Sequence, residues 1–494
     1  MNGTVLIAGG GPSGLMAACE LRLAGVDVVV FERLDEPPLW SRSGILQMRT
    51  VEVFRQRGMD FFAGYGPART YNFGLIEMKG IIDPDLVALR VPQRDIELRL
   101  DARARELGAD LRRGHTLVGL SDLGDAVRVE VEGPTGRYEL TGDYLLGCDG
   151  GSSVVRKLAG IPFAGGGPSM PFSGLTGDIQ VLDPPARPIG PELHPRGMFA
   201  LFPAPDGRYR VTVLEFGAQA PDGDVPVTAA EVAEGARRVA GVEVAFGEDN
   251  LLSRFSGSTL LAESYRRGRV FLVGDAAHVH MPFGGQGLST GVQDAVNLGW
   301  KLAATIHGWA PPELLDTYHA ERHPVGRQVC DNTKAQMALL HPLERVEPLR
   351  RLLGGLVALE DVSQYFFEML SAVGIRYPVE YPGHATHPLQ GMRMPHADLT
   401  ALDSTSKVSV PEALSTARGV LIDLSGGVAD LPAADGWADR VDVYSAFPSV
   451  AIDAALVLVR PDGYVAWADA AGTDTEGLLA ALQTWFGDPL PIPA

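Results

Sequence analysis

The chain has 494 residues and a formal net charge of −19 at pH 7, with 46% hydrophobic and 21% charged residues. This length exceeds what one hydrophobic core organises, so we expect two or three folded domains and little disorder. The negative charge argues against nucleic acid or an anionic membrane as a partner, because either would require a basic surface.

No apolar run reaches the length of a membrane span, and the N-terminus leads directly into a strand without a signal-like segment. We therefore expect a cytoplasmic protein. The three cysteines, Cys19, Cys148 and Cys330, are far apart and form no CxxC pair. This spacing argues against disulfide reductases, thioredoxin-type redox chemistry and zinc ribbons.

The first motif lies at the N-terminus, where an apolar strand at residues 4–8 leads into GGGPSG and then into a helix over about 15–24. This is a GxGxxG sequence in the strand–turn–helix context that a dinucleotide site requires. A second strand, 26–31, ends in Glu32, eighteen residues after Gly14, where a carboxylate can bind both ribose hydroxyls of an adenosine. An acid at this position disfavours a 2′-phosphate.

Two further glycine–acid motifs follow strands. Residues 147–153, GCDGGSS, come after a short strand and contain Asp149. Residues 274–302 follow the buried strand VFLVG and combine Asp275 with a GGQG loop and an amphipathic helix. Glycines let the backbone approach a ligand closely, and a helix N-terminus favours negative charge. The three motifs could converge on one extended cofactor.

Between about residues 170 and 264 the chain is rich in short β runs. Segments 198–202 and 209–216 flank Pro205-Asp206-Gly207, which is a hairpin signal. We expect an antiparallel sheet that forms a second domain and is joined by residues 71–91 from earlier in the chain.

The helical segment 311–340 contains His319 and His323 within HAERH. This order is not HExxH, so we expect packing or capping and no metal site. His278 and His280 also carry no metal signal, although either could reach a bound cofactor. The tail, residues 417–490, predicts the order strand, helix, strand, strand, helix, which suits a small α/β domain.

In this order and spacing the motifs resemble the class A FAD-dependent aromatic hydroxylases of the p-hydroxybenzoate hydroxylase and phenol hydroxylase type. The resemblance covers nearly the whole chain and is closest to bacterial aromatic polyketide hydroxylases, such as those of angucyclines and anthracyclines. It implies an α/β plus antiparallel β fold. A Rossmann-like FAD-binding domain would span 1–70, 92–172 and 265–382, and an inserted β-sheet substrate domain 71–91 and 173–264. A thioredoxin-like C-terminal domain without redox cysteines, at 383–494, would pack or dimerise; its RPDGYVAW run carries that part of the resemblance.

The resemblance also implies residue roles. FAD, bound non-covalently, would have its ADP half at the first motif and Glu32, with Asp149 at the junction and Asp275 at the ribitol and pyrophosphate. Segments 41–43 and 49–52 resemble the stretch beside the flavin in which an arginine, here Arg42 or Arg49, meets the pyrophosphate. The expected cofactor contacts are Gly9, Gly11, Pro12, Ser13, Gly14, Glu32, Arg33, Arg42, Gln93, Asp149, Gly274, Asp275, Pro282, Gly285, Gly287, Leu288 and Ser289.

No catalytic acid or base is assigned, and the candidates next to the flavin ring are Arg42, Pro282, Phe283 and Gly285. Backbone N–H groups around 287–290 would stabilise the negative charge of reduced flavin. The sequence departs from the family at Ser289, where Asn is usual, and at Phe283, where smaller residues are common. Candidate substrate-lining residues are Phe73, Met78, Phe199, Leu201, Phe202 and Phe283. For each of them a place in the sheet's own core is an equally strong alternative.

The resemblance implies a monooxygenase that consumes NAD(P)H and O2 and hydroxylates a polycyclic phenolic substrate through a C4a-hydroperoxyflavin, in secondary metabolism. The same flavin chemistry could instead give Baeyer–Villiger oxidation, epoxidation, or N-hydroxylation that inactivates an aromatic antibiotic. A nucleotide-binding protein without turnover is a third hypothesis, against which the intact Glu32, Asp149 and Asp275 argue. The expected partner is a small aromatic molecule, without metal, nucleic acid or membrane, and a homodimer is one option.

Overall fold

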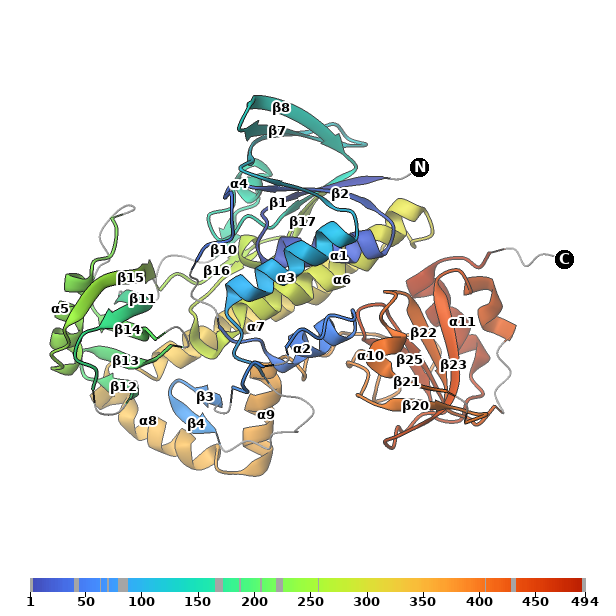
Figure 1. Ribbon diagram of the computed structural model, residues 1–494. Coiled ribbons are helices and arrows are strands. Elements are labelled where there is room, and N and C mark those ends of the chain that lie inside the picture. Colours follow the sequence, from blue (N-terminus) through green and yellow to red (C-terminus); the bar gives the residue numbers. More distant parts are fainter. Residues whose placement is uncertain are drawn as a thin grey trace.

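The computed structural model describes residues 3–39, 44–62, 64–68, 71–78, 88–164, 172–185, 188–204, 207–218, 225–255, 257–404, 406–427 and 432–490. Arg42, a candidate for contact with the flavin, and Pro205 and Asp206 of the expected hairpin turn lie outside these ranges. The long helices α6 (Gly287–His307) and α7 (Asp316–Ala338) run through the middle of the molecule (Figure 1). An antiparallel sheet lies at one end of them and a C-terminal unit at the other.

The first sheet has six strands in the order β17-β18-β9-β1-β2-β5. Its central strands β1 (Thr4–Ala8), β2 (Asp27–Glu32), β9 (Tyr144–Gly147) and β18 (Val270–Leu272) pair in parallel, as does β5 (Asp110–Arg113) with β2; β17 (Arg266–Arg267) is antiparallel. Strands β1, β2, β9 and β18 are mainly apolar, as parallel strands covered by helices are, and α1 (Pro12–Leu23) packs on β1 and β2. The expected strand–turn–helix order of the first motif is confirmed.

The register of this sheet brings the three sequence motifs together. Ala8 at the end of β1 lies opposite Gly147 at the end of β9, and Gly147 lies opposite Leu272 at the end of β18. The turns that follow these three strands therefore meet at one edge. The carboxyl edge of a parallel sheet is where ligands bind in open α/β folds.

A five-stranded antiparallel sheet has the order β12-β13-β14-β11-β15. Its strands are β11 (Phe172–Val181), β12 (Ile189–His194), β13 (Gly197–Pro203), β14 (Tyr209–Phe216) and β15 (Phe246–Phe255). The expected hairpin is confirmed, since β13 and β14 pair along their whole length. Helix α5 (Ala229–Ala240) packs on one face, and the other face turns towards the central helices.

The segment 71–78 does not join that sheet. Strands β3 (Tyr71–Phe73) and β4 (Ile76–Met78) form a two-stranded ribbon of their own, so residues 71–78 do not pair with the larger sheet. The ribbon packs against helices α8 (Leu343–Leu356) and α9 (Glu360–Ser371). A further antiparallel sheet, β6 (Thr116–Asp122), β7 (Val127–Gly133) and β8 (Gly136–Gly142), precedes β9 and was not predicted.

The C-terminal unit contains a six-stranded sheet in the order β21-β20-β23-β22-β24-β25. The predicted strands appear as β22 (Gly419–Asp423), β24 (Leu456–Val459) and β25 (Val465–Asp469), and the last helix as α11 (Thr475–Phe486). The helix expected after β22 is a 3₁₀ turn, η3 (Pro432–Trp437), and strands β20 (Asp398–Ala401), β21 (Lys407–Ser409) and β23 (Val441–Pro448) were missed. Trp300 of α6 packs into the core of this unit beside Trp485 and Phe486.

No helix in the described ranges combines the length and the apolar character needed to cross a membrane.

Candidate functional site

The turn after β1 packs directly against the other two motifs. A Cβ atom on Gly9 would lie 2.3 Å from the carbonyl oxygen of Cys148, so only glycine permits this approach. Ser13 at the start of α1 touches the third motif, since its Oγ would lie 2.6 Å from a Cβ on Gly274. The three turns therefore form one continuous backbone surface at the sheet edge.

Glu32 holds the first turn in place. Its carboxylate accepts hydrogen bonds from the N–H of Gly10 at 2.6 Å and of Leu34 at 2.9 Å. The side chain is half-buried at the end of β2, and Arg33, next in the chain, is exposed. A carboxylate oxygen has more than one lone pair, so Glu32 retains acceptor capacity for a ligand hydroxyl.

Asp149 caps the short helix α4 (Val154–Leu158). Its carboxylate accepts from the hydroxyl of Ser153 at 2.5 Å and from the N–H groups of Val154 and Val155 at 2.6 and 3.0 Å. These bonds satisfy N–H groups that the start of a helix leaves free. The observed role of Asp149 is to shape the second turn, and its contact with a nucleotide stays a prediction.

The third motif is a chain of short turns between β18 and α6. Asp275 is exposed in the turn η1 (Gly274–Ala276), and the glycine loop follows as η2 (Phe283–Gly285). Gly284 and Gly285 both have positive φ, 77° and 60°, which two successive side-chain-bearing residues would rarely adopt. Pro282, before the loop, is exposed.

Helix α2 (Met48–Arg55) anchors this loop. The side-chain Nε2 of Gln47 donates to the carbonyl of Gly284 at 2.7 Å, and the Gln47 N–H donates to the hydroxyl of Ser289 at 3.0 Å. Ser289 is buried, so its side chain joins two protein segments where an open flavin contact was expected. Leu288 packs against the main core. The shorter Ser289 thus suits the close approach of α2.

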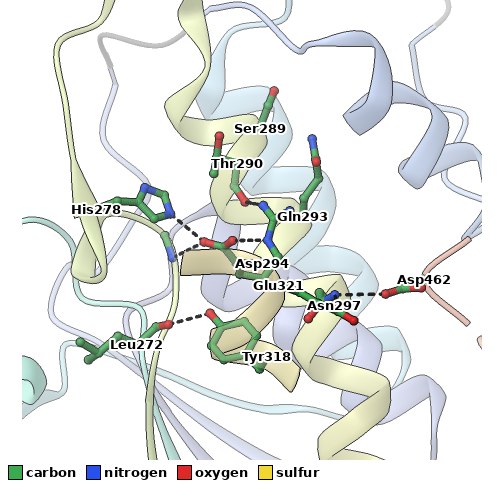
Figure 2. A network of polar contacts seen from close by, with 12 residues as sticks. Leu272, His278, Ser289, Thr290, Gln293, Asp294, Asn297, Tyr318, Glu321 and Asp462 are labelled. Atoms are coloured by element: carbon green, nitrogen blue, oxygen red, sulfur yellow. Dashed lines mark hydrogen bonds and ion pairs between the residues drawn. The ribbon is translucent and has the colours of Figure 1, made fainter. Parts of the chain in front are cut away.

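A buried ion cluster joins the third motif, at Gly274 and His278, to helices α6 and α7 (Figure 2). Asp294 of α6 accepts from Arg322 Nε and from His278 Nε2, each at 2.7 Å, and from the N–H of Gly274 at 3.2 Å. Asp294 and Arg322 are fully buried. Burial alone would raise the pKa of Asp294, but Arg322 and His278 hold it below its usual value. The carboxylate is therefore charged and ties the turn after β18 to α6 and α7.

A second buried cluster joins α6 and α7 to the C-terminal unit. Arg460 donates to both oxygens of Glu321 at 2.6 and 2.9 Å, and Lys301 donates to Glu321 at 2.7 Å. Asn297 of α6 donates to Asp462 at 3.2 Å (Figure 2). Burial would raise the pKa of Glu321, but Arg460 and Lys301 lower it to about 2. Burial lowers the pKa of Lys301 to about 8, against the opposing effect of Glu321.

Arginines of the N-terminal part point the opposite way, into the C-terminal unit. Arg57 pairs with Glu20 and donates to the carbonyls of Pro461 and Leu414 at 2.7 and 2.9 Å. Arg49 is buried, pairs with Glu52 and donates to the carbonyl of Asp462 at 2.7 Å. The expectation that Arg49 runs beside the flavin is therefore wrong.

The HAERH histidines have packing roles. His319 Nδ1 accepts from the N–H of Tyr265 at 3.2 Å, and His323 Nε2 donates to the carbonyl of Ala262 at 3.1 Å. These contacts confirm the packing interpretation. Within the described ranges, no three His, Cys, Asp or Glu side chains are grouped for a metal ion.

Gln93 begins α3 (Gln93–Glu106) and donates from Nε2 to Glu97 at 2.7 Å, so its side chain has a protein partner. An open cleft of about 260 Å³ lies between α9 and the residues around Met392 and has Met48 in its lining. Met48 follows Gln47, the residue that anchors the glycine loop.

Comparison with known proteins decides the family. Residues 2–333 match the family model of the FAD binding domain, and residues 387–489 match that of the aromatic-ring hydroxylase C-terminal domain. A 12-dehydrotetracycline 5-monooxygenase/anhydrotetracycline 6-monooxygenase from Streptomyces rimosus is 44% identical over 98% of this chain and 99% of that protein. The chain belongs to the FAD-dependent aromatic-ring hydroxylases.

Two further proteins are similar to this chain over almost its whole length. A dialkyldecalin synthase from Streptomyces rugosporus is 42% identical, with 99% of both chains covered. The solved structure of the anhydrotetracycline hydroxylase OxyS from Streptomyces rimosus is 42% identical, with a TM-score of 0.90 over 99% of this chain and 100% of that one. The tetracycline-modifying relatives are named monooxygenases, and the chain is an FAD-dependent monooxygenase.

The structure corrects the expected substrate-lining residues of the hydroxylase. Phe199 and Leu201 are fully buried under α5 with Val232 and Ala236, on the face of the sheet that turns away from the glycine loop. Phe73 and Met78 pack between the β3–β4 ribbon and helices α8 and α9. These four residues belong to local cores, as the alternative interpretation had it.

Phe283 lies in a different apolar cluster, which faces the central helices. This cluster joins the inner face of the five-stranded sheet to the glycine loop and α7, and contains Phe172, Met198, Leu214, Phe255, Met281, Met337 and Leu340. Phe202 follows Met198 by four residues along β13, so it lies on the same face of the sheet, where it is half-buried. Sequence reasoning missed most of this cluster because β13 is apolar on both faces.

Proposed function

We propose that this hydroxylase uses FAD, NAD(P)H and O2 to hydroxylate a polycyclic aromatic phenol of the polyketide type in secondary metabolism. The observation that carries the proposal is the meeting of three glycine–acid turns at one sheet edge, next to an apolar cluster on the facing sheet. The tetracycline-hydroxylating relatives provide the substrate class.

The residues at this edge fit FAD. The exposed carboxylate of Asp275 suits a polyol, the half-buried Glu32 suits a ribose, and the start of α6 provides backbone N–H groups for negative charge. Bound FAD would supply the redox chemistry that activates O2, and the protein would bind, orient and shield it.

The protein's own task is then to place the substrate and exclude water. We infer that the ring system of the substrate lies between Phe283 and the inner face of the five-stranded sheet, near Met198 and Phe172. These side chains offer apolar contact and few competing polar atoms, so they orient a flat molecule and keep its surroundings dry. A phenol carries its own activating oxygen, so no side chain is needed as an obligate base.

We also propose the division into domains given by the sequence: 1–70, 92–172 and 265–382 for FAD, 71–91 and 173–264 for substrate, and a thioredoxin-like domain at 383–494. The buried arginines Arg57 and Arg460 support a fixed attachment of the last domain, whose role would be to hold α2 and α6. The boundary near 383 accords with the C-terminal family match from 387.

The central test is flavin binding and flavin-dependent turnover. The purified protein should be yellow, and an aromatic polyketide should accelerate its oxidation of NAD(P)H. Asp275→Ala should lose FAD while keeping the circular dichroism of the wild type, because Asp275 is exposed and outside the core. Asp331→Ala is a matched control on the exposed face of α7. A wild type that takes up no FAD, or full flavin occupancy in Asp275→Ala, would contradict the assignment.

A second candidate function is favoured by one relative. The dialkyldecalin synthase carries the name of a ring-forming enzyme, at an identity close to that of the tetracycline monooxygenases. Mass spectrometry of the product distinguishes the two functions. A gain of one oxygen with consumption of NAD(P)H supports hydroxylation, whereas conversion without added oxygen supports ring formation.

A further inference from the structure

His280 presents an unused polar atom next to the third motif. Its Nδ1 lies 2.8 Å from the carbonyl oxygen of Met281, whereas its Nε2 is shielded from solvent and has no hydrogen-bond partner in the described part of the chain. A carbonyl only accepts, so Nδ1 carries the proton of the ring. In the neutral ring Nε2 is then an acceptor with a free lone pair.

The neutral form is favoured by the surroundings of His280. Burial lowers the pKa of His280, and the neighbouring His278 lowers it further. The usual histidine pKa is about 6.5, so a lowered value leaves the ring neutral at pH 7.

The free atom of His280 shares a space with Asp275. A Cβ atom on Gly287, the first residue of α6, would lie 3.2 Å from His280 Nε2 and 3.9 Å from Asp275 Oδ1. Both atoms therefore face the space beside this glycine, at the start of α6 and at the carboxyl end of β18. Two hydrogen-bond acceptors, His280 Nε2 and Asp275 Oδ1, therefore border this space, and Gly287 has no side chain that would fill it.

Two acceptors call for a ligand that brings donors. In FAD the ribityl chain carries hydroxyl donors, whereas the diphosphate carries only acceptors, which neither Asp275 nor neutral His280 can bind. We propose that His280 Nε2 accepts a hydrogen bond from a ribityl hydroxyl of FAD, beside Asp275. This inference rests on the proposed binding of FAD and adds a side-chain ligand that the sequence motifs did not assign.

The groups that face His280 allow a pH test. They are His278 from β19 (His278–Val279), whose ring is stacked with that of His280 at 6.4 Å, and Asp275 from η1. Behind His278 the carboxylate of Asp294 is paired with Arg322. A proton on His280 Nε2 converts the acceptor into a donor and removes the proposed bond. Because the pKa of His280 is lowered, the affinity for FAD should fall only at a pH below the usual histidine pKa.

The experiment measures dissociation constants of FAD and of ADP for the apoprotein, with flavin fluorescence for FAD and competition for ADP. His280→Phe keeps a flat ring without an acceptor, and His280→Gln keeps an acceptor oxygen at similar reach. We expect His280→Phe to weaken FAD binding about tenfold and His280→Gln to restore most of the affinity. ADP lacks the ribityl chain, so its affinity should be the same in all forms. His307→Phe, an exposed histidine at the far end of α6, is the matched control.

The outcomes separate this inference from the proposed function. Unchanged FAD affinity in His280→Phe, or an equal loss for ADP and FAD, would overturn the ribityl contact while leaving FAD binding intact. Wild-type affinity that rises towards low pH would also overturn it, because that trend marks a protonated His280 at the diphosphate. The falling trend should vanish in His280→Gln. A wild type that binds no FAD would overturn the proposed function together with the inference.

Discussion

Arg460 of the C-terminal unit donates to both carboxylate oxygens of Glu321 on α7, at 2.6 and 2.9 Å, and both side chains are buried. A buried pair of this kind gives little net stability relative to an apolar pair, but loss of one partner leaves an uncompensated charge. The attachment of the C-terminal unit therefore depends on the completeness of this pair.

The first prediction concerns this pair. Arg460→Met should lower the free energy of unfolding by about 3–5 kcal/mol, because Asp462 loses its buried counter-charge and Glu321 keeps only Lys301. Chemical denaturation measures the change. Arg103→Met removes the exposed pair with Glu106 and should cost no more than about 1 kcal/mol. Equal effects of the two substitutions would show that the buried pair has no special role.

The second prediction concerns acid. The pKa of Glu321 is about 2 in the folded protein and near 4.5 when unfolded, so the unfolded chain binds more protons between these values. The stability from Glu321 is present above about pH 4.5 and is lost as the pH falls towards 2, with a total of about 3 kcal/mol. The pH profile of the melting temperature should flatten in Glu321→Gln over this window. An unchanged slope would contradict the charged state of Glu321.

The third prediction concerns the cluster behind the third motif. Asp294→Asn keeps the shape of the side chain but leaves Arg322 buried without its carboxylate, at a cost of about 3–5 kcal/mol. Because Asp294 also accepts from the N–H of Gly274, FAD binding should weaken as well. Thermal unfolding and flavin titration report the two effects. Wild-type FAD affinity in a destabilised variant would confine the role of Asp294 to folding.

The fourth prediction compares two neighbours on β13. Phe199 is buried under α5 and Met198 faces the cluster that contains Phe283. Phe199→Ala should cost about 3–5 kcal/mol of stability and leave the KM for the aromatic substrate unchanged. Met198→Ala should raise the KM, because it removes a contact near the proposed substrate. Steady-state kinetics and thermal melts of both variants show which face of β13 contacts the substrate. A raised KM in Phe199→Ala alone would assign the substrate to the face under α5.

The parallel sheet and its three turns could be predicted from the sequence because β1, β9 and β18 are short apolar runs followed by glycines, and because the acids Glu32, Asp149 and Asp275 stand at or just after strand ends. Buried parallel strands require the first feature and close ligand approach requires the second. Glu32 and Asp275 accordingly lie at the same sheet edge as Gly9 in the structure. The contacts that Asp149 makes with α4 are equally local, and a helix start after an acid is their sequence signal.

The lining of the substrate region could not be predicted in the same way. Residues 198–202 are apolar at every position, so alternation does not distinguish the face of Phe199 from that of Met198. Only the position of α5, which arrives from later in the chain, assigns the two faces.

The contacts of Arg49 and Arg460 could not be predicted for a different reason. Arg49 contacts Asp462 more than 400 residues later in the chain, and Arg460 contacts Glu321 139 residues earlier. A single sequence gives arginine an exposed position by default, and the match to a flavin-side segment directed attention to the wrong neighbour of Arg49. Buried long-range ion pairs have no local pattern that marks them.

The arginine contacts between the N-terminal part and the C-terminal unit also affect how the chain folds during its synthesis on the ribosome. Glu321 on α7 is made well before Arg460, and Arg57 on the N-terminal side waits for the carbonyl of Pro461. Until that turn has left the ribosome, Glu321 has only Lys301 as a counter-charge, and Arg57 has Glu20 but lacks the carbonyl of Pro461. The FAD-binding part should therefore reach its compact state after translation has passed residue 462. Chains that end shortly before this residue should be degraded.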